Sequence, residues 1–319
     1  MVEFGHLLAA ALAVLAVPAL AEPVPGTNFQ RYVTTDGRGG ALTYYLSEAP
    51  YPKPLAVVIQ GSGCGALFRP AAGGAMNAVG HHGLLRSVVG ERYRVLAVEK
   101  PGAKSASEPP SGGNAQDCPR RFLAEHTVEK WAEALKAALA AARQKSGVIP
   151  DRTLVIGHSE GGVAAARLAR LDPKISHVAL LASPGPDPVE ELVLWGESRG
   201  RKRPETEATI ALIRAKPDSI TDFAFGHPYR RWSSYLSADP VADLLGSPAR
   251  VFAVHGEADT NWPFAAHVSL VDRLRDAGHA VDAVRLAGAD HSLNHPGQRP
   301  PEGMADIFRQ ILVWAGGGT

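Results

Sequence analysis

Cysteine is scarce in this 319-residue sequence, which holds only Cys64 and Cys118, and it has no excess of charge of either sign. Two cysteines are too few for a disulfide framework and lack the paired spacing of a structural zinc site. The 33 basic and 32 acidic side chains leave a net charge of +1. Because nothing in that balance would neutralise a phosphate backbone, we expect no nucleic-acid partner.

Long apolar runs are also lacking. The longest candidate, residues 7–21, is shorter than the roughly 20 residues that a membrane-spanning helix requires, so no stable membrane insertion is expected. With 45% apolar and 20% charged residues, the composition is that of an ordinary globular protein and excludes disordered, collagen-like and coiled-coil chains. A chain of this length hides about 75% of its unfolded surface on folding, which is enough for a large core.

The N-terminus resembles an export signal. An apolar run from Leu7 to Val17 precedes Pro18 and the triplet at residues 19–21, which fits a hydrophobic region followed by an A-x-A cleavage site. We therefore predict a signal peptide over residues 1–21, cleavage near Ala21 and a periplasmic or secreted protein. The segment departs from the usual pattern in having no Lys or Arg, and the alternative is a buried N-terminal helix, which the prolines would interrupt.

Export would allow Cys64 and Cys118 to oxidise. A bridge over that span could stabilise the fold by ~4 kcal/mol in the chain-entropy model. The sequence does not decide between this disulfide and two separate buried thiols.

Short β-rich runs alternate with helical patterns from about residue 41, which is typical of a parallel sheet covered on both faces. We predict a doubly wound, mostly parallel α/β fold. The predicted strands are Ala41–Leu46, Leu55–Gln60, Tyr93–Val98, Thr153–Ile156, His177–Leu181, Val251–Val254 and Val281–Leu286. Apolar residues at helical spacing predict helices over 128–142, 264–274 and 304–314.

One connection is much too long for this rhythm. More than sixty residues separate two predicted strands between Pro184 and Pro248, far beyond an ordinary strand-to-helix connection. We predict a mainly helical cap over 184–248, inserted into an α/β core formed by 22–183 and 249–319. Within it, the charged stretch Ser198–Glu207 is interpreted as a solvated loop, with an anion-binding patch as the alternative.

The most specific motif is GHSEG at residues 157–161, directly after a predicted strand and before a predicted helix. A G-x-S-x-G run in that context is a nucleophile elbow, in which glycines permit a sharp turn that exposes the serine. The following helix directs its N-terminus at the hydroxyl, which favours the negative charge that develops when a carbonyl is attacked. Ser159 is the predicted nucleophile.

A serine hydroxyl needs a base, and the base needs an orienting acid. Asp259 and His291 follow predicted strands, in the chain order that this fold requires and at the sheet edge where ligands bind. Glu257 is the alternative acid and His295 the alternative base. His158 and His255 are interpreted as structural neighbours of these turns, without an obvious acid partner.

The loop at residues 61–65, GSGCG, follows an early strand and is the predicted oxyanion loop. The N–H of Glu160 and one from Gly61 or Ser62, with Ser62 preferred, are the expected donors. The same loop matches G-x-G-x-x-A, but no acid follows at the distance that a dinucleotide site needs. No P-loop or H-E-x-x-H motif occurs, so neither cofactor nor metal is expected.

Through GHSEGG at 157–162, the run ending at Asp259 and the Ala-Asp-His run ending at His291, the chain resembles the α/β-hydrolase superfamily over about residues 41–316. The elbow is similar to those of the dienelactone-hydrolase-like and prolyl-oligopeptidase-like branches, which include esterases and peptidases. The resemblance implies a cofactor-free Ser-His-Asp hydrolase with a cap over its pocket. The chain departs from many relatives in having Gln60-Gly61 where they have His-Gly.

Three hypotheses follow. The first is an exported serine hydrolase that cleaves a small-molecule carboxylic ester through an acyl-enzyme on Ser159. The second is a peptidase or amidase with the same triad, in which Glu190, Glu191 or Glu197 of the cap would hold a substrate ammonium group. The third is a non-catalytic binding protein that keeps the elbow as scaffold.

Overall fold

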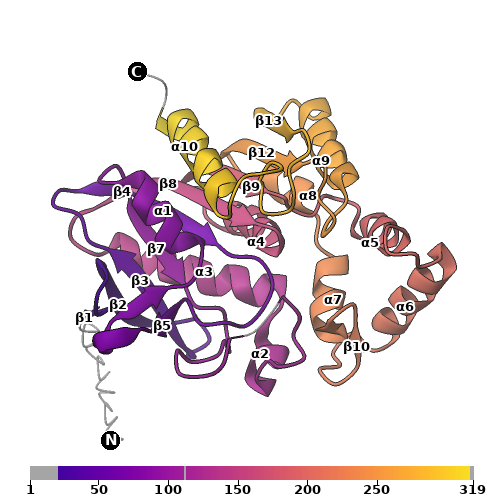
Figure 1. Ribbon diagram of the computed structural model, residues 1–319, viewed down its shortest axis with the longest axis horizontal. Helices are drawn as coiled ribbons and strands as arrows, with labels where there is room; N and C mark the ends of the chain where they lie inside the picture. Colours follow the sequence, from indigo (N-terminus) through magenta and orange to yellow (C-terminus); the bar gives the residue numbers. More distant parts are fainter. Residues whose placement is uncertain (1–20, 111–112, 317–319) are drawn as a thin grey trace, which may run out of the picture.

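The computed structural model describes residues 21–110 and 113–316, and within them the chain builds one nine-stranded sheet (Figure 1). Its strands follow the order β1-β2-β3-β7-β4-β8-β9-β12-β13. The last six in that order run parallel, whereas β1, β2 and β3 pair antiparallel at one end. The strands are β1 (Glu22–Pro23), β2 (Phe29–Thr35), β3 (Ala41–Ser47), β4 (Lys53–Ile59), β7 (Arg94–Val98), β8 (Val148–His158), β9 (Ile175–Leu181), β12 (Arg250–Gly256) and β13 (Val281–Leu286). A doubly wound, mostly parallel sheet was predicted, and it is confirmed.

Each predicted strand lies inside or beside an observed one, and the largest difference is in β8, which begins at Val148 and ends at His158. Its first five residues are exposed or half-buried, and Pro150, Asp151 and Arg152 interrupt the apolar run, so the sequence lacks a continuous apolar signal there. Strand β2 has no predicted counterpart because its alternation of buried and half-buried residues is mixed with Gln30 and Arg31.

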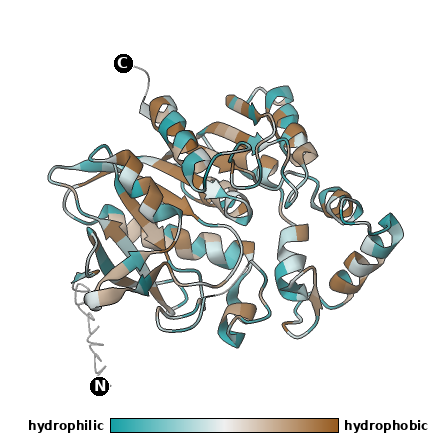
Figure 2. Cartoon of the chain, in the orientation of Figure 1, coloured by the Kyte–Doolittle hydropathy of each residue, from teal (hydrophilic) through white to brown (hydrophobic). Residues whose placement is uncertain are grey.

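Helices cover both faces of the sheet, and the side chains of β4 alternate between them. Leu55, Val57 and Ile59 join the core beneath α3, α4, α8 and α9, whereas Ala56 and Val58 join the core beneath α1 and α10. Figure 2 shows the brown, apolar residues concentrated on the strands. These helices are α1 (His81–Val89), α3 (Val128–Arg143), α4 (Glu160–Leu171), α8 (Pro240–Leu245), α9 (Phe264–Asp276) and α10 (Glu302–Gly316).

The segment between β9 and β12 holds further helices. They lie to one side of the sheet, at the right of Figure 1. Their apolar side chains form a separate cluster that includes Leu192, Ile210 and Trp232. The stretch 198–207 is not wholly a loop, because a helix begins at Arg203. The guanidinium of Arg203 pairs with three glutamates, so it is not free to bind an anion. The elements are α5 (Pro188–Glu197), α6 (Arg203–Ala215), β10 (Phe223–Ala224), β11 (His227–Pro228) and α7 (Tyr229–Leu236).

Cys64 and Cys118 form a disulfide, with their Cα atoms 5.8 Å apart. The bridge ties residues 61–65, after β4, to the segment that precedes α2 (Arg120–Glu125). Of the two alternatives that the sequence left open, the structure contains the bridge rather than separate thiols.

The predicted signal peptide lies outside the described residues, apart from Ala21. Over the ranges that are described, no helix combines the length and the apolar character needed to cross a bilayer.

Candidate active site

Ser159 lies on a sharp turn between β8 and α4, with φ +55° and ψ −129°. A non-glycine residue adopts positive φ only at a cost, and such strain is common at functional sites. The turn requires its glycines, because a Cβ at Gly157 would collide with the backbone of Gly161, and a Cβ at Gly161 would collide with the carbonyl of Ile59. The predicted elbow geometry is present, and it holds the Ser159 hydroxyl at the carboxyl end of the sheet.

Asp259 and His291 meet at the same edge. Nδ1 of His291 lies 2.7 Å from Oδ2 of Asp259, and the other carboxylate oxygen accepts the backbone N–H groups of Asn261 and Trp262. Burial of the carboxyl favours its neutral form, but hydrogen bonds from His255 and His291 outweigh this and place the pKa of Asp259 well below its usual range. Asp259 is therefore ionised and fixes which nitrogen of His291 carries the proton.

The residue before the nucleophile anchors the histidine loop. Nε2 of His158 lies 2.9 Å from the carbonyl oxygen of His291, and the two rings are 4.9 Å apart. Burial holds the pKa of His158 well below the ordinary histidine value, so this ring is neutral and donates from Nε2. Ser159 and His291 line the same cavity, and within the described ranges no hydrogen bond joins their side chains in this conformation. Such bonds often tighten only when substrate is bound.

The three predicted oxyanion residues surround the nucleophile. Gly61, Ser62 and Glu160 all line the cavity that holds Ser159. Gly61 lies so close that a Cβ on it would stand 3.2 Å from Cβ of Ser159. As the first residue of α4, Glu160 has a backbone N–H without an acceptor inside its own helix.

The side chain of Glu160 is the centre of a buried charge cluster. Its Oε1 accepts from Nε of Arg231 at 2.8 Å and lies 3.0 Å from Nε2 of His126, and its Oε2 lies 3.6 Å from the ammonium of Lys100. Burial would raise the pKa of this carboxyl, but the neighbouring Arg231, His126 and Lys100 together lower it well below the ordinary value. Glu160 is therefore a buried anion directly after the nucleophile.

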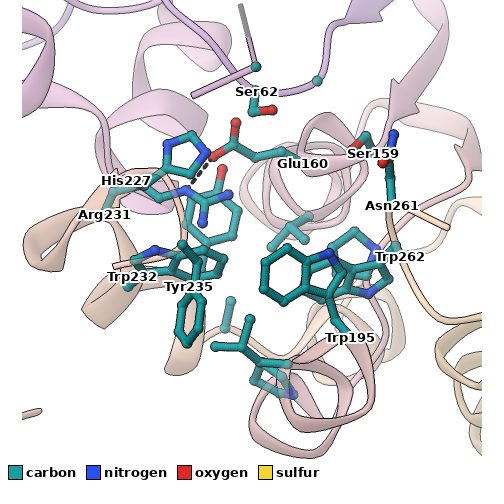
Figure 3. A pocket seen from close by; sticks show the side chains of 18 of the residues that line it. Ser62, Ser159, Glu160, Trp195, His227, Arg231, Trp232, Tyr235, Asn261 and Trp262 are labelled. Atoms are coloured by element: carbon teal, nitrogen blue, oxygen red, sulfur yellow. Dashed lines mark hydrogen bonds and ion pairs between the residues drawn. The ribbon is translucent and has the colours of Figure 1, made fainter. Parts of the chain in front are cut away.

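The cavity has a volume of about 510 Å³ and is lined by both the sheet edge and the segment 184–248. Figure 3 shows Trp195 and Trp262 beside Ser159 and Asn261, with His227 and Arg231 nearer to Ser62 and Glu160. The guanidinium of Arg231 stacks over the rings of Trp232 and Tyr235, at 4.0 and 4.2 Å from their centroids. Aromatic walls and a small number of polar groups make a site for an organic ligand.

The alternative residues lie elsewhere. Glu257 pairs with Arg285, and His295 is exposed and bonds the carbonyl of Ala287, so neither takes the place of Asp259 or His291. The interpretation of His255 as lacking an acid partner is wrong, because its Nε2 lies 3.0 Å from Oδ2 of Asp259. The four-residue turn between them brings the two side chains together.

The three glutamates of the predicted cap do not face the cavity. Glu190 and Glu197 pair with Arg203, and Glu191 is buried, where it accepts from the N–H groups of Gly185 and Asp187 and from the indole of Trp262. None of the three lines the cavity. The ammonium-binding role expected for them in a peptidase therefore has no support in their positions.

Two important residues escaped the sequence reading. Lys100 follows β7 and Arg231 lies in α7, and both contact Glu160. The position of Lys100 just beyond a parallel strand is the kind of signal that marks a site in α/β sheets. Arg231 gave no such signal, since its contact with Glu160 spans 71 residues of sequence.

Over the described ranges, only Cys64, Asp117 and Cys118 bring three potential metal-ligating atoms close together. Both cysteine sulfurs are already joined to each other, and a disulfide sulfur is not the thiolate that binds metals.

Comparisons with known proteins agree with this architecture. The profile of the prolyl oligopeptidase family matches residues 219–317. A putative dienelactone hydrolase from Klebsiella pneumoniae superposes with a TM-score of 0.56 at 17% identity, over 91% of this chain and 99% of that one. Est1E from Butyrivibrio proteoclasticus gives 0.55 at 15% identity, over 94% and 99%. No curated protein sequence matches the chain significantly.

An acylaminoacyl peptidase from Pyrococcus horikoshii superposes with a TM-score of 0.61 at 12% identity, covering 92% of this chain but 41% of the peptidase. The chain thus spans about two fifths of that protein, compared with nearly all of the dienelactone hydrolase and Est1E. These likenesses confirm the α/β-hydrolase fold and the predicted resemblance to both branches.

Proposed function

We propose that this chain, with its α/β-hydrolase fold, is a serine hydrolase that cleaves a carboxylic ester through an acyl-enzyme on Ser159. The observation that carries the proposal is the 2.7 Å contact between Asp259 and His291, at the rim of the cavity into which the elbow presents Ser159. A nucleophile, a base and an orienting acid are the parts that acyl transfer requires.

In the proposed reaction, Oγ of Ser159 attacks the ester carbonyl while Nε2 of His291 takes the hydroxyl proton. The developing oxyanion accepts hydrogen bonds from the N–H groups of Glu160 and Ser62. The C–O bond to the alcohol then breaks, and His291 gives its proton to the leaving alcohol. Water, deprotonated by His291, hydrolyses the acyl-enzyme, and Asp259 stabilises the imidazolium in both halves.

The charges of the cavity favour an uncharged or anionic substrate. Glu160 is the single acid among the residues that line it, and Arg231 already neutralises its carboxylate. Arg199 lines the cavity as well, 4.2 Å above the ring of Trp195. A substrate with a free ammonium group would meet no unpaired carboxylate, which supports an ester over a peptide trimmed from its N-terminus.

Replacing Ser159 tests the proposal. We expect Ser159→Ala to abolish hydrolysis of 4-nitrophenyl butyrate and labelling by a fluorophosphonate, because the nucleophile is gone while the fold keeps its shape. Ser292→Ala, an exposed-loop serine beside His291, is the control and should retain both activities. Undiminished turnover in Ser159→Ala would refute the acyl-enzyme, and failure of the intact protein to react with any serine-directed probe would favour a binding protein.

A peptidase or amidase remains the second candidate, since the prolyl oligopeptidase family profile matches the C-terminal third of the chain. Methyl butyrate and an N-acylated amino acid amide, measured side by side, separate the two reactions. Methyl ferulate belongs in the series because a solved structure of Est1E holds ferulic acid. A higher kcat/KM for the amide would replace esterase by peptidase as the function.

We also propose that the protein is exported and cleaved after Ala21. The disulfide between Cys64 and Cys118 supports this, because such bridges persist in oxidising compartments. Expression of the full chain in its host, followed by mass spectrometry of the mature protein, should give Glu22 as the first residue. An intact N-terminus on a cytoplasmic protein would contradict export.

A further inference from the structure

Lys100 reaches the oxyanion loop from behind. It follows β7, its side chain is only 10% exposed, and it lines a second cavity that Gly61, Ser62 and Gly63 also line and His291 does not. Its ammonium donates to the carbonyl oxygen of Gly61 at 2.5 Å and to that of Gly63 at 2.9 Å. Gly61 and Gly63 are the neighbours of Ser62 in the chain, so one side chain holds the loop through the residues before and after the preferred oxyanion donor.

Because the peptide bond between Gly61 and Ser62 is trans, this contact also determines the direction of the Ser62 N–H. The carbonyl of Gly61 and the N–H of Ser62 belong to the same planar peptide group and point in opposite directions. The carbonyl of Gly61 points to Lys100 and the second cavity. The N–H of Ser62 therefore points the opposite way, towards Ser159, against which Gly61 packs. Within the described ranges no hydrogen bond occupies that N–H.

The ammonium of Lys100 also contacts the side chain of Glu160, the residue that provides the second expected oxyanion donor. Nζ of Lys100 lies 3.6 Å from Oε2 of Glu160, whose backbone N–H is the second expected donor. Arg231 and His126 fix the other carboxylate oxygen, so Glu160 is itself immobilised. The two halves of the oxyanion hole, from loop 61–65 and from the start of α4, are therefore joined through one charged group.

Stability alone does not account for a lysine in this position. Burying an ammonium costs several kcal/mol, and apolar residues of similar volume often replace buried ion pairs without loss of stability. Here the cost is offset by two carbonyls, one carboxylate and the ring of Trp131, whose centroid is 4.4 Å from Nζ. Because Lys100 uses most of its interactions on the oxyanion loop, its presence is better explained by a role in positioning that loop.

We propose that Lys100 is a positioning residue for the oxyanion hole, which holds the carbonyls on both sides of Ser62 so that the Ser62 N–H meets the substrate oxygen beside the N–H of Glu160. This inference rests on the proposed esterase function, because it assigns the geometry of that same site.

The test compares Lys100→Met with Lys104→Met, using 4-nitrophenyl butyrate. Lys104 is also buried and belongs to the same connection, but its ammonium pairs with Asp117 and contacts neither loop carbonyl. We expect Lys100→Met to lower kcat roughly 10- to 100-fold with KM within about 3-fold, somewhat less than outright loss of an oxyanion donor. Lys104→Met should keep kcat within about 2-fold.

A transition-state analogue supplies a readout that a merely structural residue would not move. An aryl trifluoromethyl ketone adds to Ser159 and places an oxyanion in the hole, so its inhibition constant in Lys100→Met should rise by the same factor as kcat falls. Inhibition by the product butyrate should change little. Equal weakening of both ligands would show a general distortion of the site and overturn the inference.

The pH profile offers a second readout. Burial lowers the pKa of Lys100 to about 8, with Glu160 opposing this shift and Arg231 adding to it, while the neighbouring ring of His126 is neutral because burial lowers its own pKa. The ammonium is therefore present below pH 8 and lost above it, so kcat of the wild type should fall above pH 8 in a step that Lys100→Met lacks. If kcat of Lys100→Met fell above pH 8 in the same way as that of the wild type, the positioning role of Lys100 would be contradicted.

The outcomes separate this inference from the function. If wild-type turnover does not depend on Ser159, the proposed function fails. If turnover depends on Ser159 and folded Lys100→Met keeps kcat within about 2-fold of the wild type, the function stands and the positioning role fails. Should Lys100→Met not fold, Lys100→Gln replaces it, since the shorter amide cannot reach both carbonyls, and the same limits apply.

Discussion

Asp259 illustrates how one side chain serves two histidines. Its Oδ2 lies 2.7 Å from His291 and 3.0 Å from His255, and its Oδ1 accepts two backbone N–H groups. Both oxygens of the carboxylate therefore have partners, which fixes its orientation before substrate arrives. His255 supports the acid from the strand side and leaves His291 free to face the cavity.

Glu99, next to Lys100, is a buried acid with an incomplete set of partners. Its Oε1 accepts from the N–H of Leu67 and from the hydroxyl of Tyr45, while its Oε2 has no partner among the described residues. Burial raises the pKa of this carboxyl to about 7. The folded state therefore holds a proton that the unfolded state releases at lower pH, so stability falls as pH rises towards 7.

Glu99→Gln should remove that penalty. We expect its melting temperature to be close to that of the wild type at pH 5 and several degrees higher at pH 8, measured by differential scanning calorimetry. Glu91→Gln, at an exposed position, is the control and should show the same difference at both pH values. If the difference in melting temperature between Glu99→Gln and the wild type were no larger at pH 8 than at pH 5, ionisation of Glu99 would not destabilise the native fold.

At the scale of single residues, sequence reasoning predicted the positions that local rules determine. Ser159 and its glycines follow from the steric needs of one turn, and Asp259 and His291 follow from strand ends. The contacts of Lys100 and Arg231 depend on how distant elements pack, which no local pattern encodes. The missed acid partner of His255 has another cause, because a turn of four residues reverses the chain between two side chains that appear separated in sequence.

Helix α5 contributes Trp195 and Leu192 to the wall of the cavity. Trp195 is only half-buried, and its ring meets Phe225 edge-on at 5.5 Å between centroids. Its cavity-facing position suits an aromatic or bulky apolar part of the substrate, because edge-to-face aromatic pairs gain ~0.5–1.5 kcal/mol beyond burial.

We expect Trp195→Ala to raise KM for methyl 3-phenylpropanoate about 10-fold with little change in kcat or melting temperature, since the ring binds ground state and transition state alike. Methyl acetate, too small to reach the ring, should be hydrolysed as by the wild type. Trp314→Ala, on α10 outside the cavity, is the matched control. An equal loss on both esters would show that Trp195 maintains the fold instead.

Among the elements, those with strong apolar periodicity were predicted closely. The helix expected over 128–142 is α3, Val128–Arg143, and the strand expected over Val281–Leu286 is β13 with the same bounds. The short helix α1 was missed, since it begins with two histidines and contains Gly83. It packs against α10, a contact between segments more than 200 residues apart in the sequence.

For the molecule as a whole, the disulfide joins the site to the segment beneath the cap. Cys64 lies in the oxyanion loop, and Cys118 packs with Ala115 and Phe122 in a small cluster that also touches Phe223. Holding these segments together limits the movement of the loop that carries Ser62. The bridge therefore contributes both to stability and to the geometry of the site.

Cys64→Ala/Cys118→Ala should lose ~4 kcal/mol of stability in the chain-entropy model and show a lower kcat, because the loop has lost one anchor. Dithiothreitol should lower the melting temperature of the wild type and leave that of the variant unchanged. Calorimetry and ester turnover under both conditions provide the check. Identical melting temperatures with and without reductant, after thiol titration has confirmed reduction, would contradict a stabilising bridge.

The fold class followed from the sequence because alternating strand and helix patterns permit few topologies. The antiparallel pairing of β1, β2 and β3 did not, since β1 has only two residues, β2 mixes apolar and polar residues, and the strand predicted at β3 carries no signal of its direction. The pairing of the two cysteines could not be derived either, because it depends on a 5.8 Å approach that only the folded chain creates.

The N–H of Ala115 donates to the carbonyl of Gly226 at 2.7 Å, so the segment 113–118 touches the turn between β10 and β11 on one side and the disulfide on the other. This has a practical consequence for chimeras. A donor cap grafted over residues 184–248 alone would leave that N–H facing a foreign surface and would disturb the oxyanion loop through the bridge. Chimeras that exchange residues 113–118 together with residues 184–248 would keep the hydrogen bond between Ala115 and Gly226. The two segments should therefore be exchanged together.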